Sequence, residues 1–340
     1  MSKVSMASIA QQLGVSRTLV SLVLNGKGDQ FGISKATQQA VIELAQKLDY
    51  QPNSLARTLR TGKSTILGLI VSDIANPFYS RMARTIEDIA WKEGYKLMVC
   101  SADEDPAKEV QLFQMLRQSL NAEGIIVSSG LMDAQPYQPS MDKDFPVVFI
   151  DRMLPGVEGR SVIIDNYRGA ERATEHLIEA GKKRVALITI GPSHLSSIND
   201  RRKGYEAALI KKGFQVNPEL IVEASFDNLE KDTAAAVTKL MKSDYVPDAI
   251  FAANNRVGLV VIETLAALGK KIPKDVALIC FDDIEAFRVC SPPVTAVEQP
   301  VEDLSRHAIE KLLKMINKTD SATESDAGTL SPRLIVRQSV

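Results

Sequence analysis

The feature that most constrains the fold of this chain is a pattern of short apolar segments separated by amphipathic segments, which begins at Ile66. The apolar segments predict eight strands, at Ile66–Val71, Leu97–Cys100, Gly124–Val127, Val147–Ile150, Val185–Ile190, Leu220–Val222, Ala249–Ala252 and Val276–Cys280. The intervals between them predict helices, for example at Pro77–Glu93, Ala107–Ser119, Asp200–Lys212 and Arg256–Leu268. Strands that alternate with helices form parallel sheets through right-handed crossovers, so an α/β fold is expected.

The pattern occurs twice. A helix followed by a glycine and an aromatic residue stands at Gly94-Tyr95 and again at Gly213-Phe214, and the first strands of the two sets begin at Ile66 and Arg184. Two similar lobes in tandem predict a cleft between them, because ligands of open α/β sheets bind beyond the carboxyl ends of the strands. The polar stretch Thr319–Gly328 is expected to be a connection, followed by a last strand at Arg333–Val336.

The segment before Pro52 predicts a small helical unit of three helices: Met6–Leu13, Arg17–Leu24 and a longer helix capped by Ser34 that continues to Leu48. Gly14 is expected to end the first helix, and Ser16 to cap the second. For the third, Ile42, Leu44, Ala45 and Leu48 are expected on the apolar face. Beyond Pro52, Asn53 or Ser54 can cap a very short helix at Leu55–Arg60.

Two helices joined by a turn that contains glycine are typical of a helix-turn-helix unit, whose second helix enters the major groove of DNA. The second helix is expected to present Arg17, Thr18 and Ser21 outward, with Val15, Leu19, Val20 and Val23 facing the core. Arg17 can pair with a guanine edge, and Ser16 or Ser21 can reach a phosphate. An unrelated small helical bundle would have the same periodicity, so this segment favours DNA binding over that alternative without deciding it.

Charge is divided unevenly along the chain, although the formal net charge is only −1. Residues 1–63 hold eight Lys/Arg against three Asp/Glu, which leaves 33 basic and 39 acidic residues for the rest. A basic unit on an acidic body suits a local contact with phosphates. The N-terminus has no apolar core of a signal peptide, no apolar run is long enough to span a bilayer, and the three cysteines have no disulfide or metal spacing, so a cytoplasmic protein is expected.

Enzymatic interpretations find little support. Gly62-Lys63-Ser64 ends like a phosphate-binding loop, but the leading glycine would have to stand where Arg57 is. His194 lies among serines in a polar segment, and adjacent Asp282 and Asp283 would point to opposite sides of a strand end. The three histidines are scattered and predict no metal site. A nicotinamide-type oxidoreductase lacks its phosphate glycines, and an exported sugar-binding protein would lack the basic N-terminal unit.

Several segments resemble the lac-repressor/galactose-repressor family of transcription regulators, in order and over nearly the whole chain. They are IAQQLGVSRTLVSLVLNG (Ile9–Gly26), KLDYQPNSLARTLRTGKS (Lys47–Ser64), GLIVSDIANPFYSRM (Gly68–Met82), Asp151-Arg152, the Arg201–Tyr205 segment, PDAIFAANN (Pro247–Asn255), IPKDVALICFDDI (Ile272–Ile284), PPVTAVEQP (Pro292–Pro300) and PRLIVRQS (Pro332–Ser339). The body also resembles periplasmic sugar-binding proteins. The resemblance implies a sequence-specific DNA-binding regulator, expected to act as a repressor, with a small sugar-like effector and no cofactor.

The resemblance also implies the residues that contact DNA: Ser16, Arg17, Thr18, Ser21, Leu22, Asn53, Ala56, Leu59 and Arg60. Leu22 departs from the family, where a polar or basic residue is common, and the loop before Ser34 is about three residues longer than usual. Leu55–Arg60 matches the family's hinge helix, in which Ala56 faces the minor groove and Leu59 wedges into a base step. Packing between domains is the alternative role for Leu59.

The resemblance places these residues at the effector positions: Asn76, Phe78, Tyr79, Asp151, Arg152, Ser197, Asn199, Arg201, Phe226, Asn254, Asp282 and Gln299. Their chemistry suits a neutral polyol ring, because aromatic faces cover its C–H side while carboxylates, guanidinium groups and amides bind neighbouring hydroxyls. Ser197, Asn199 and Arg201 are expected in a loop, and Asn199 stands near a position where many sugar-binding relatives have an arginine. The alternative to effector binding for Phe78 and Tyr79 is simple packing on a helix face.

The expected organisation has four parts: a helix-turn-helix domain at residues 1–50, a hinge and linker at 51–63, an N-lobe at 64–163 plus 295–322, and a C-lobe at 164–294 plus 323–340. A homodimer, or a tetramer built from dimers, is expected on double-stranded operator DNA, because one such head reads only a half-site. Effector binding is expected to close the lobes and so to bias formation of the paired hinge helices.

Overall fold

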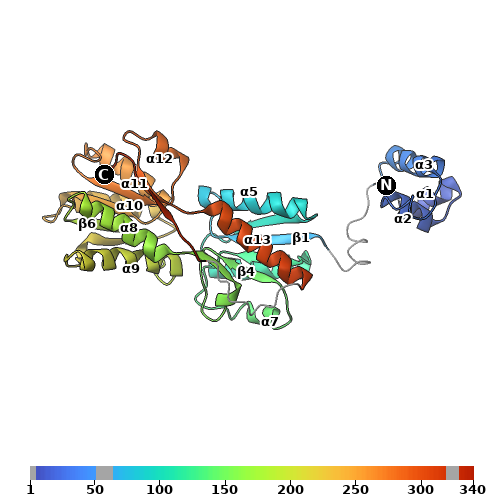
Figure 1. Ribbon diagram of the computed structural model, residues 1–340, viewed down its shortest axis with the longest axis horizontal. Coiled ribbons are helices and arrows are strands. Elements are labelled where there is room, and N and C mark those ends of the chain that lie inside the picture. Colours follow the sequence, from blue (N-terminus) through green and yellow to red (C-terminus); the bar gives the residue numbers. More distant parts are fainter. Residues whose placement is uncertain (1–4, 51–63, 319–328) are drawn as a thin grey trace. The chain divides into compact units, whose positions relative to one another are not determined.

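The computed structural model describes residues 5–50, 64–318 and 329–340, and it divides into two compact units, Met1–Ser64 and Thr65–Val340 (Figure 1). The second unit consists of two lobes, each built on one six-stranded sheet. An α/β fold with an N-terminal helical unit is therefore confirmed. The expected hinge helix at Leu55–Arg60 and the connection at Thr319–Gly328 lie outside the described residues.

The helical unit contains α1 (Met6–Leu13), α2 (Arg17–Leu24) and α3 (Lys35–Lys47), at the positions expected from the sequence. Gly14 ends α1 with φ 65°, a left-handed backbone that glycine adopts without strain. The Oγ atoms of Ser16 and Ser34 accept the amide protons of Leu19 and Thr37 and so cap α2 and α3. These caps fix where each helix begins.

The core of the helical unit forms from the apolar faces of all three helices. Its most buried members are Ile9, Ala10, Val20, Val23, Val41 and Ala45. The expectation for the third helix was wrong at one position, because Ile42 remains 37% exposed while its neighbour Val41 is fully buried. A helix turns by about 100° per residue, so a shift of one residue moves a side chain off the core-facing stripe.

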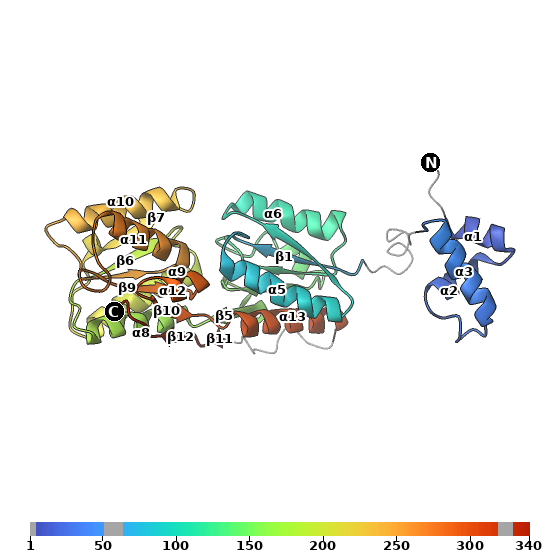
Figure 2. The same ribbon diagram turned by 90° about the horizontal axis from the view of Figure 1, so that it is seen from above.

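The elements of the N-lobe are β1 (Ile66–Val71), α5 (Pro77–Lys92), β2 (Lys96–Ser101), α6 (Pro106–Gln114) with a π-helical turn (Met115–Ser119), β3 (Gly124–Val127), α7 (Gln138–Met141), β4 (Val147–Ile150), a 3-10 turn (Glu158–Arg160), β5 (Ser161–Ile164), α13 (Val301–Asn317) and β11 (Thr329–Leu330). The sheet order is β11-β5-β4-β3-β1-β2, and all its described pairings are parallel. Figure 2 shows α6 on one face of this sheet and α5 with α13 on the other.

The elements of the C-lobe are α8 (Asn166–Glu179), β6 (Val185–Ile190), α9 (Ser196–Lys211), a 3-10 turn (Pro218–Leu220), β7 (Ile221–Ala224), α10 (Leu229–Lys242), β8 (Ala249–Ala252), α11 (Asn255–Ala267), β9 (Ala277–Phe281), α12 (Glu285–Val289), β10 (Thr295–Glu298) and β12 (Arg333–Ile335). The sheet order is β12-β10-β9-β8-β6-β7, in which only β12 is antiparallel to its neighbour. The helix pairs α8–α9 and α10–α11 cover its two faces.

Two expected lobe boundaries were wrong. Thr295–Glu298 forms β10 and pairs with β9, so the chain returns to the N-lobe after this strand and not before Thr295. Thr329–Leu330 pairs with β5, so the second crossing follows Leu330 rather than residue 322. Both segments are short strands, and their apolar pattern does not indicate which of two similar sheets they join.

Smaller corrections concern element ends. The strand expected at Leu220–Val222 begins at Ile221, because Pro218 starts a 3-10 turn that includes Leu220. The helix expected at Asp200–Lys212 begins four residues earlier, at Ser196. The helix expected at Ala107–Ser119 changes to a π-helical turn from Met115.

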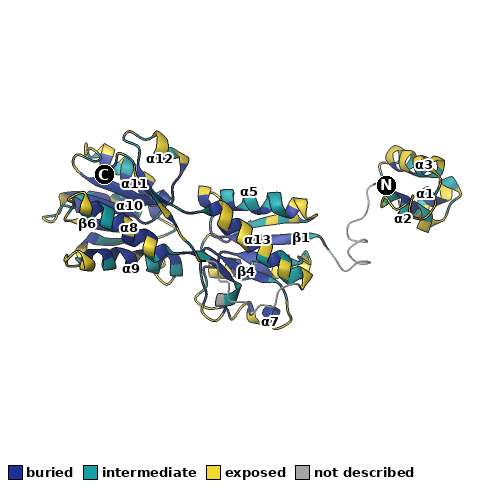
Figure 3. Cartoon of the chain, viewed as in Figure 1, coloured by how far each residue is buried: buried dark blue, intermediate teal, exposed yellow. Residues whose placement is uncertain are grey.

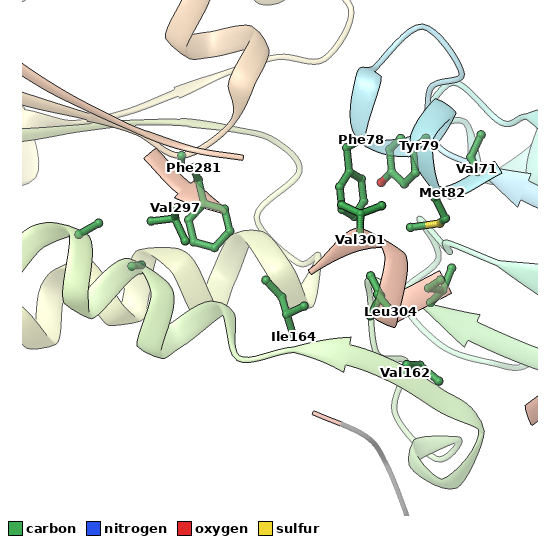
Figure 4. Close-up of a cluster of buried hydrophobic side chains, with 14 of the residues drawn as sticks. Val71, Phe78, Tyr79, Met82, Val162, Ile164, Phe281, Val297, Val301 and Leu304 are labelled. Carbon is green, nitrogen blue, oxygen red and sulfur yellow. The ribbon is translucent and has the colours of Figure 1, made fainter. Parts of the chain in front are cut away.

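The central strands of both sheets are buried on both faces, as parallel sheets covered by helices require (Figure 3). One apolar cluster includes side chains of both lobes near their crossing points. Figure 4 shows Phe78 and Val301 of the N-lobe with Phe281 and Val297 of the C-lobe, and Ile164 between them. The two lobes therefore share an apolar contact.

Candidate functional site

A narrow cavity lies between the two lobes, at the carboxyl ends of their strands. Its wall includes eleven of the twelve effector residues expected from the sequence: Asn76, Phe78, Tyr79, Asp151, Arg152, Ser197, Arg201, Phe226, Asn254, Asp282 and Gln299. It also includes Ser72, Asp73, Glu104, Ile190, Ile198 and Arg256, which sequence reasoning missed. The cavity measures about 40 Å³, enough for a few water molecules.

The two sheets end at the cavity in the same way. Asp151 follows β4 and Asp282 follows β9, and both residues have φ 70°. A left-handed backbone is uncommon for residues other than glycine and costs conformational energy that the surrounding structure must offset. Both carboxylates are nevertheless buried in the cavity wall. Each lobe thus holds one acid at the end of a central strand, in the same left-handed backbone conformation.

The N-lobe wall is a connected hydrogen-bond network around Asp151. The Tyr79 hydroxyl donates to Asp151 Oδ2 at 3.0 Å and lies 3.2 Å from the hydroxyls of Ser72 and Ser128. Burial raises the pKa of Tyr79 well above its ordinary value, so the hydroxyl remains a donor at every physiological pH. Tyr79 therefore holds the Asp151 carboxylate in place.

Arg152 is the cation of the N-lobe wall. Its Nη1 and Nη2 atoms donate to Glu104 Oε2 at 2.7 Å and to Oε1 at 2.5 Å, while its Nε lies 3.7 Å from Asp151 Oδ2. Burial lowers the pKa of Arg152, but Tyr79, Glu104 and Asp151 outweigh that effect and raise it above its ordinary value. Arg152 is therefore a permanent cation that two carboxylates neutralise.

The C-lobe wall is paired more loosely. Arg201 donates from Nε to Asn166 Oδ1 and from Nη1 to the carbonyl of Ala253, both at 2.8 Å, and approaches Asp282 only to 4.0 Å. Its guanidinium also lies 3.8 Å from the ring centroid of Phe281. Burial raises the pKa of Asp282, although Arg201 and a hydrogen bond from Gln299 oppose that rise. Among the described residues the buried Oε1 of Gln299 has no hydrogen-bond partner.

Contacts between the lobes surround the cavity. Asn255 donates to Asn76 Oδ1 at 2.9 Å, and Arg256 pairs with Asp73 at 3.0 Å. The amide of Met153 donates to Ser196 Oγ at 2.9 Å, and the His194 ring lies 3.1 Å from the carbonyl oxygen of Gly130. These contacts join the lobes in a closed arrangement.

In the helical unit, α2 is capped by Ser16 and exposes Arg17 and Thr18, while Ser21 and Leu22 are half-buried. The inward residues Val20 and Val23 pack against α1 and α3. One row of side chains on α2 therefore remains outside the core, as a helix that enters a DNA groove requires. The remaining expected DNA contacts, Asn53, Ala56, Leu59 and Arg60, lie outside the described residues.

Residues 5–53 match the model of the bacterial regulatory proteins of the lacI family, and residues 174–340 match the periplasmic binding protein-like domain. The chain is 33% identical over 313 residues to the ribose operon repressor of Bacillus subtilis strain 168, which covers 92% of this chain and 93% of that protein. The chain belongs to the lacI family.

Other relatives agree. The chain is 29% identical over 340 residues to the HTH-type transcriptional repressor PurR of Haemophilus influenzae strain PittEE, a match that covers 98% of this chain and 97% of that protein. The solved structure of the lac repressor dimer bound to operator and the anti-inducer ONPF has a TM-score of 0.80 at 21% identity, over 99% of each chain, and shares the fold. This lacI-family chain is a DNA-binding transcriptional regulator and not an enzyme.

Asp282 lines the cavity, whereas Asp283 pairs with Arg337 at 2.7 Å outside it, so the two acids point apart as expected. Among the described residues there is no group of histidine, cysteine and acidic side chains that could hold a metal ion. The described helices include none long and apolar enough to span a bilayer.

The sequence predicts Ser197, Asn199 and Arg201 in a loop. That prediction is wrong, because these residues lie in the first two turns of α9. Ser197 and Arg201 are four residues apart and share one helix face, which is buried at the cavity. Asn199 points to another side of the helix and does not line the cavity. The early start of α9 therefore explains why two of the three positions reach the cavity.

Proposed function

We propose that this lacI-family regulator is a repressor whose effector is a neutral monosaccharide bound in the interlobe cavity. The observation that carries the proposal is the convergence of Asp151, Arg152, Asp282 and Gln299 on one buried cavity. Carboxylates and a guanidinium group can each bind two neighbouring hydroxyls, which a pyranose or furanose ring presents around its edge.

Aromatic side chains complete this interpretation. The rings of Phe78 and Tyr79 pack edge to face with centroids 5.0 Å apart, and both line the cavity. Phe226 lies at another part of the wall, with Arg256 5.6 Å from its ring centroid. Such faces cover the apolar C–H side of a sugar ring. Phe78 also packs in the apolar cluster between the lobes, so the packing and binding roles coexist.

The relatives support a sugar or a purine as effector, since one is a ribose operon repressor and another is named PurR. The cavity favours the sugar because its charged groups suit several adjacent hydroxyls. Isothermal titration of the full chain with pentoses, hexoses and nucleobases tests the choice. We expect a pentose or hexose to bind and nucleobases to give no heat. Tight binding of a nucleobase, with no response to any sugar, would contradict the proposal.

We infer that the regulator binds a pseudo-palindromic operator as a homodimer in the cytoplasm, where the chromosome lies, because one helix-turn-helix unit reads only a half-site. Arg17→Ala should weaken specific binding by about 1–3 kcal/mol and relax base choice at one symmetric position. Sedimentation with DNA from upstream of its own operon measures the stoichiometry, and distinguishes a dimer from a tetramer. One protomer on a single asymmetric site would be incompatible with this arrangement.

We propose that Leu59 acts as the wedge in a hinge helix that forms on specific DNA, supported by the family's hinge motif in this sequence. A segment of about six residues is too short to hold a helix alone in water. Leu59→Ala should reduce operator bending, measured by gel mobility of circularly permuted DNA fragments, and leave effector binding unchanged. Equal bending by both proteins would exclude this role.

A further inference from the structure

Glu104 lines the cavity, and the sequence pattern did not single it out. Its side chain is only 10% exposed, and both of its carboxylate oxygens accept hydrogen bonds from Arg152. Two donors of one guanidinium group facing two oxygens of one carboxylate make the strongest ion-pair geometry available to these groups. Two of the Arg152 nitrogen atoms that could hold an acidic ligand are therefore already bound, whereas its buried Nε has no hydrogen-bond partner among the described residues.

The backbone before α6 is shaped to hold Glu104 there. Asp103 and Glu104 have φ 54° and 55°, two consecutive left-handed residues that are not glycine. Such conformations persist where the surrounding structure enforces them. On one side Asp103 bonds to Ser101 and Lys108, and on the other Asp105 caps α6 by accepting the amide protons of Ala107 and Lys108.

Gly130 leaves room for the Glu104 carboxylate. A Cβ atom at Gly130 would lie 3.3 Å from Glu104 Oε2, closer than an ordinary contact, and 3.9 Å from Arg152 Nη1. The carbonyl of the same glycine meets the His194 ring of the C-lobe. The wall around Glu104 is thus closely packed on the N-lobe side and is covered by the C-lobe.

Every arginine among the described residues of the cavity wall has an acid nearby. The acids are Asp73, Glu104, Asp151 and Asp282, and the bases are Arg152, Arg201 and Arg256. Each of these arginines lies within 4.0 Å of at least one of these carboxylates. An entering phosphate or carboxylate would therefore meet a carboxylate close to each arginine, in a largely buried wall where charge repulsion is strong.

We propose that Glu104 is the residue that makes the cavity select neutral ligands over anionic ones, by occupying two donors of Arg152 and placing a negative charge beside them. The inference rests on the proposed function and deepens it, since it explains why a free sugar and not a sugar phosphate is the effector. Without the Glu104 charge, Arg152 has a donor pair that a phosphate or a carboxylate can accept.

Glu104→Gln tests the proposal, because the amide has nearly the same shape and no charge. Titration calorimetry of the full chain with inorganic phosphate and with ribose 5-phosphate, at constant ionic strength, measures the change. The wild-type protein should show no detectable binding of either anion. The variant should gain about tenfold or more in affinity for both, as expected when one charge at contact distance is removed. Affinity for a neutral monosaccharide should change less.

Two matched variants separate the Glu104 charge from other effects. Asp103→Asn removes one charge from the same loop at a side chain that does not line the cavity, and should leave phosphate affinity at the wild-type level. Glu104→Asp keeps the charge while shortening the side chain, and should still exclude phosphate. If Glu104→Gln unfolds, the proposal requires Glu104→Ala to gain phosphate affinity, as measured by a phosphate-dependent rise in melting temperature.

The proposal is overturned if Glu104→Gln and Asp103→Asn bind phosphate equally, or if the wild-type protein already binds ribose 5-phosphate tightly. A different result would show that the proposed effector class is wrong. In that case no neutral monosaccharide binds the wild-type protein, while the comparison of phosphate affinities still decides the role of Glu104.

Discussion

The two lobes contribute to the cavity in different ways, although they share a fold and place one strained aspartate each at a strand end. In the N-lobe, Asp151 accepts from Tyr79, and Arg152 is held by Glu104 with two hydrogen bonds. In the C-lobe, Arg201 directs its hydrogen bonds to Asn166 and Ala253 and stands 4.0 Å from Asp282.

This difference suggests a division of labour. Most of the N-lobe wall is organised before a ligand arrives, so binding there costs little reordering, and the buried Nε of Arg152, which has no partner among the described residues, can donate to a ligand hydroxyl. The C-lobe wall has an acid whose pKa burial raises and a buried Gln299 oxygen without a partner among the described residues, and a ligand can satisfy both. Closing the C-lobe onto a sugar already held by the N-lobe would then supply the differential contacts that any population shift needs.

The largest effect is expected from Asp151→Ala in the organised wall. The change removes the acceptor of Tyr79 and one of the two acids near Arg152, besides the contact with the sugar that we propose for Asp151. Losing a charge-assisted hydrogen bond to the ligand and the order of the wall around it should cost about 3 kcal/mol, roughly a hundredfold in affinity, which calorimetry with the monosaccharide measures. Asp283→Ala is the matched control, since it removes a buried acid outside the cavity and should lower stability without changing sugar affinity. Unchanged sugar affinity in Asp151→Ala would show that the N-lobe wall was misassigned.

A smaller effect is expected from Asp282→Asn in the C-lobe wall. This change should lower sugar affinity but raise the stability of the fold near neutral pH. Burial raises the pKa of Asp282, so the folded chain binds this proton more tightly than the unfolded chain. Its stability contribution is therefore greatest below the ordinary pKa of 3.8 and falls as the pH rises from there through the raised folded pKa.

Asp282→Asn carries no titrating proton and should escape that loss. Its free energy of unfolding relative to the wild-type protein should rise with pH from about pH 4 towards neutrality, by on the order of 1 kcal/mol, while sugar affinity falls. Urea denaturation at several pH values provides the measurement, with Asp283→Asn as the control. If the difference in free energy of unfolding between Asp282→Asn and the wild-type protein does not change with pH, the proposed contrast between the two walls is wrong.

The smallest effect is expected from Arg256→Ala, which removes a contact between the lobes. Arg256 pairs with Asp73 across the cleft and with Glu230 in its own lobe, and it is partly exposed. Partly exposed pairs contribute up to about 1 kcal/mol and weaken in salt, so sugar affinity should fall a few-fold at low salt and less at high salt. Arg202→Ala removes a pair within α9 and should change neither value. Equal effects of the two variants would mean that the Asp73 contact does not hold the lobes together.

Much of the fold could be predicted because its signals are local. Caps at Ser16 and Ser34 and the glycine stop at Gly14 placed the three helices of the small unit, and buried apolar runs placed most strands. The lobe assigned to Thr295–Glu298 could not be predicted in this way, because strand pairing depends on contacts far along the chain.

Most residues of the cavity wall were predicted from the family's motifs. The wall residues that the resemblance did not place at effector positions were not predicted. Glu104 lies in the acidic run Asp103-Glu104-Asp105, which by itself is typical of a solvated turn. Only its left-handed backbone and the packing of Gly130 beside it show that this acid turns inward. Asp73 and Arg256 meet across the cleft from positions 183 residues apart, a pairing that no sequence spacing indicates.

The central claim is that the interlobe cavity and the operator-binding unit are coupled through one effector. Fluorescence anisotropy with labelled DNA from upstream of its own operon, titrated with the monosaccharide identified by calorimetry, tests this directly. Because linkage is reciprocal, the sugar should change operator affinity, and Asp151→Ala should shift the sugar concentration for half the effect by the same factor as its calorimetric Kd. Operator affinity that is independent of a sugar bound in the cavity would contradict the account.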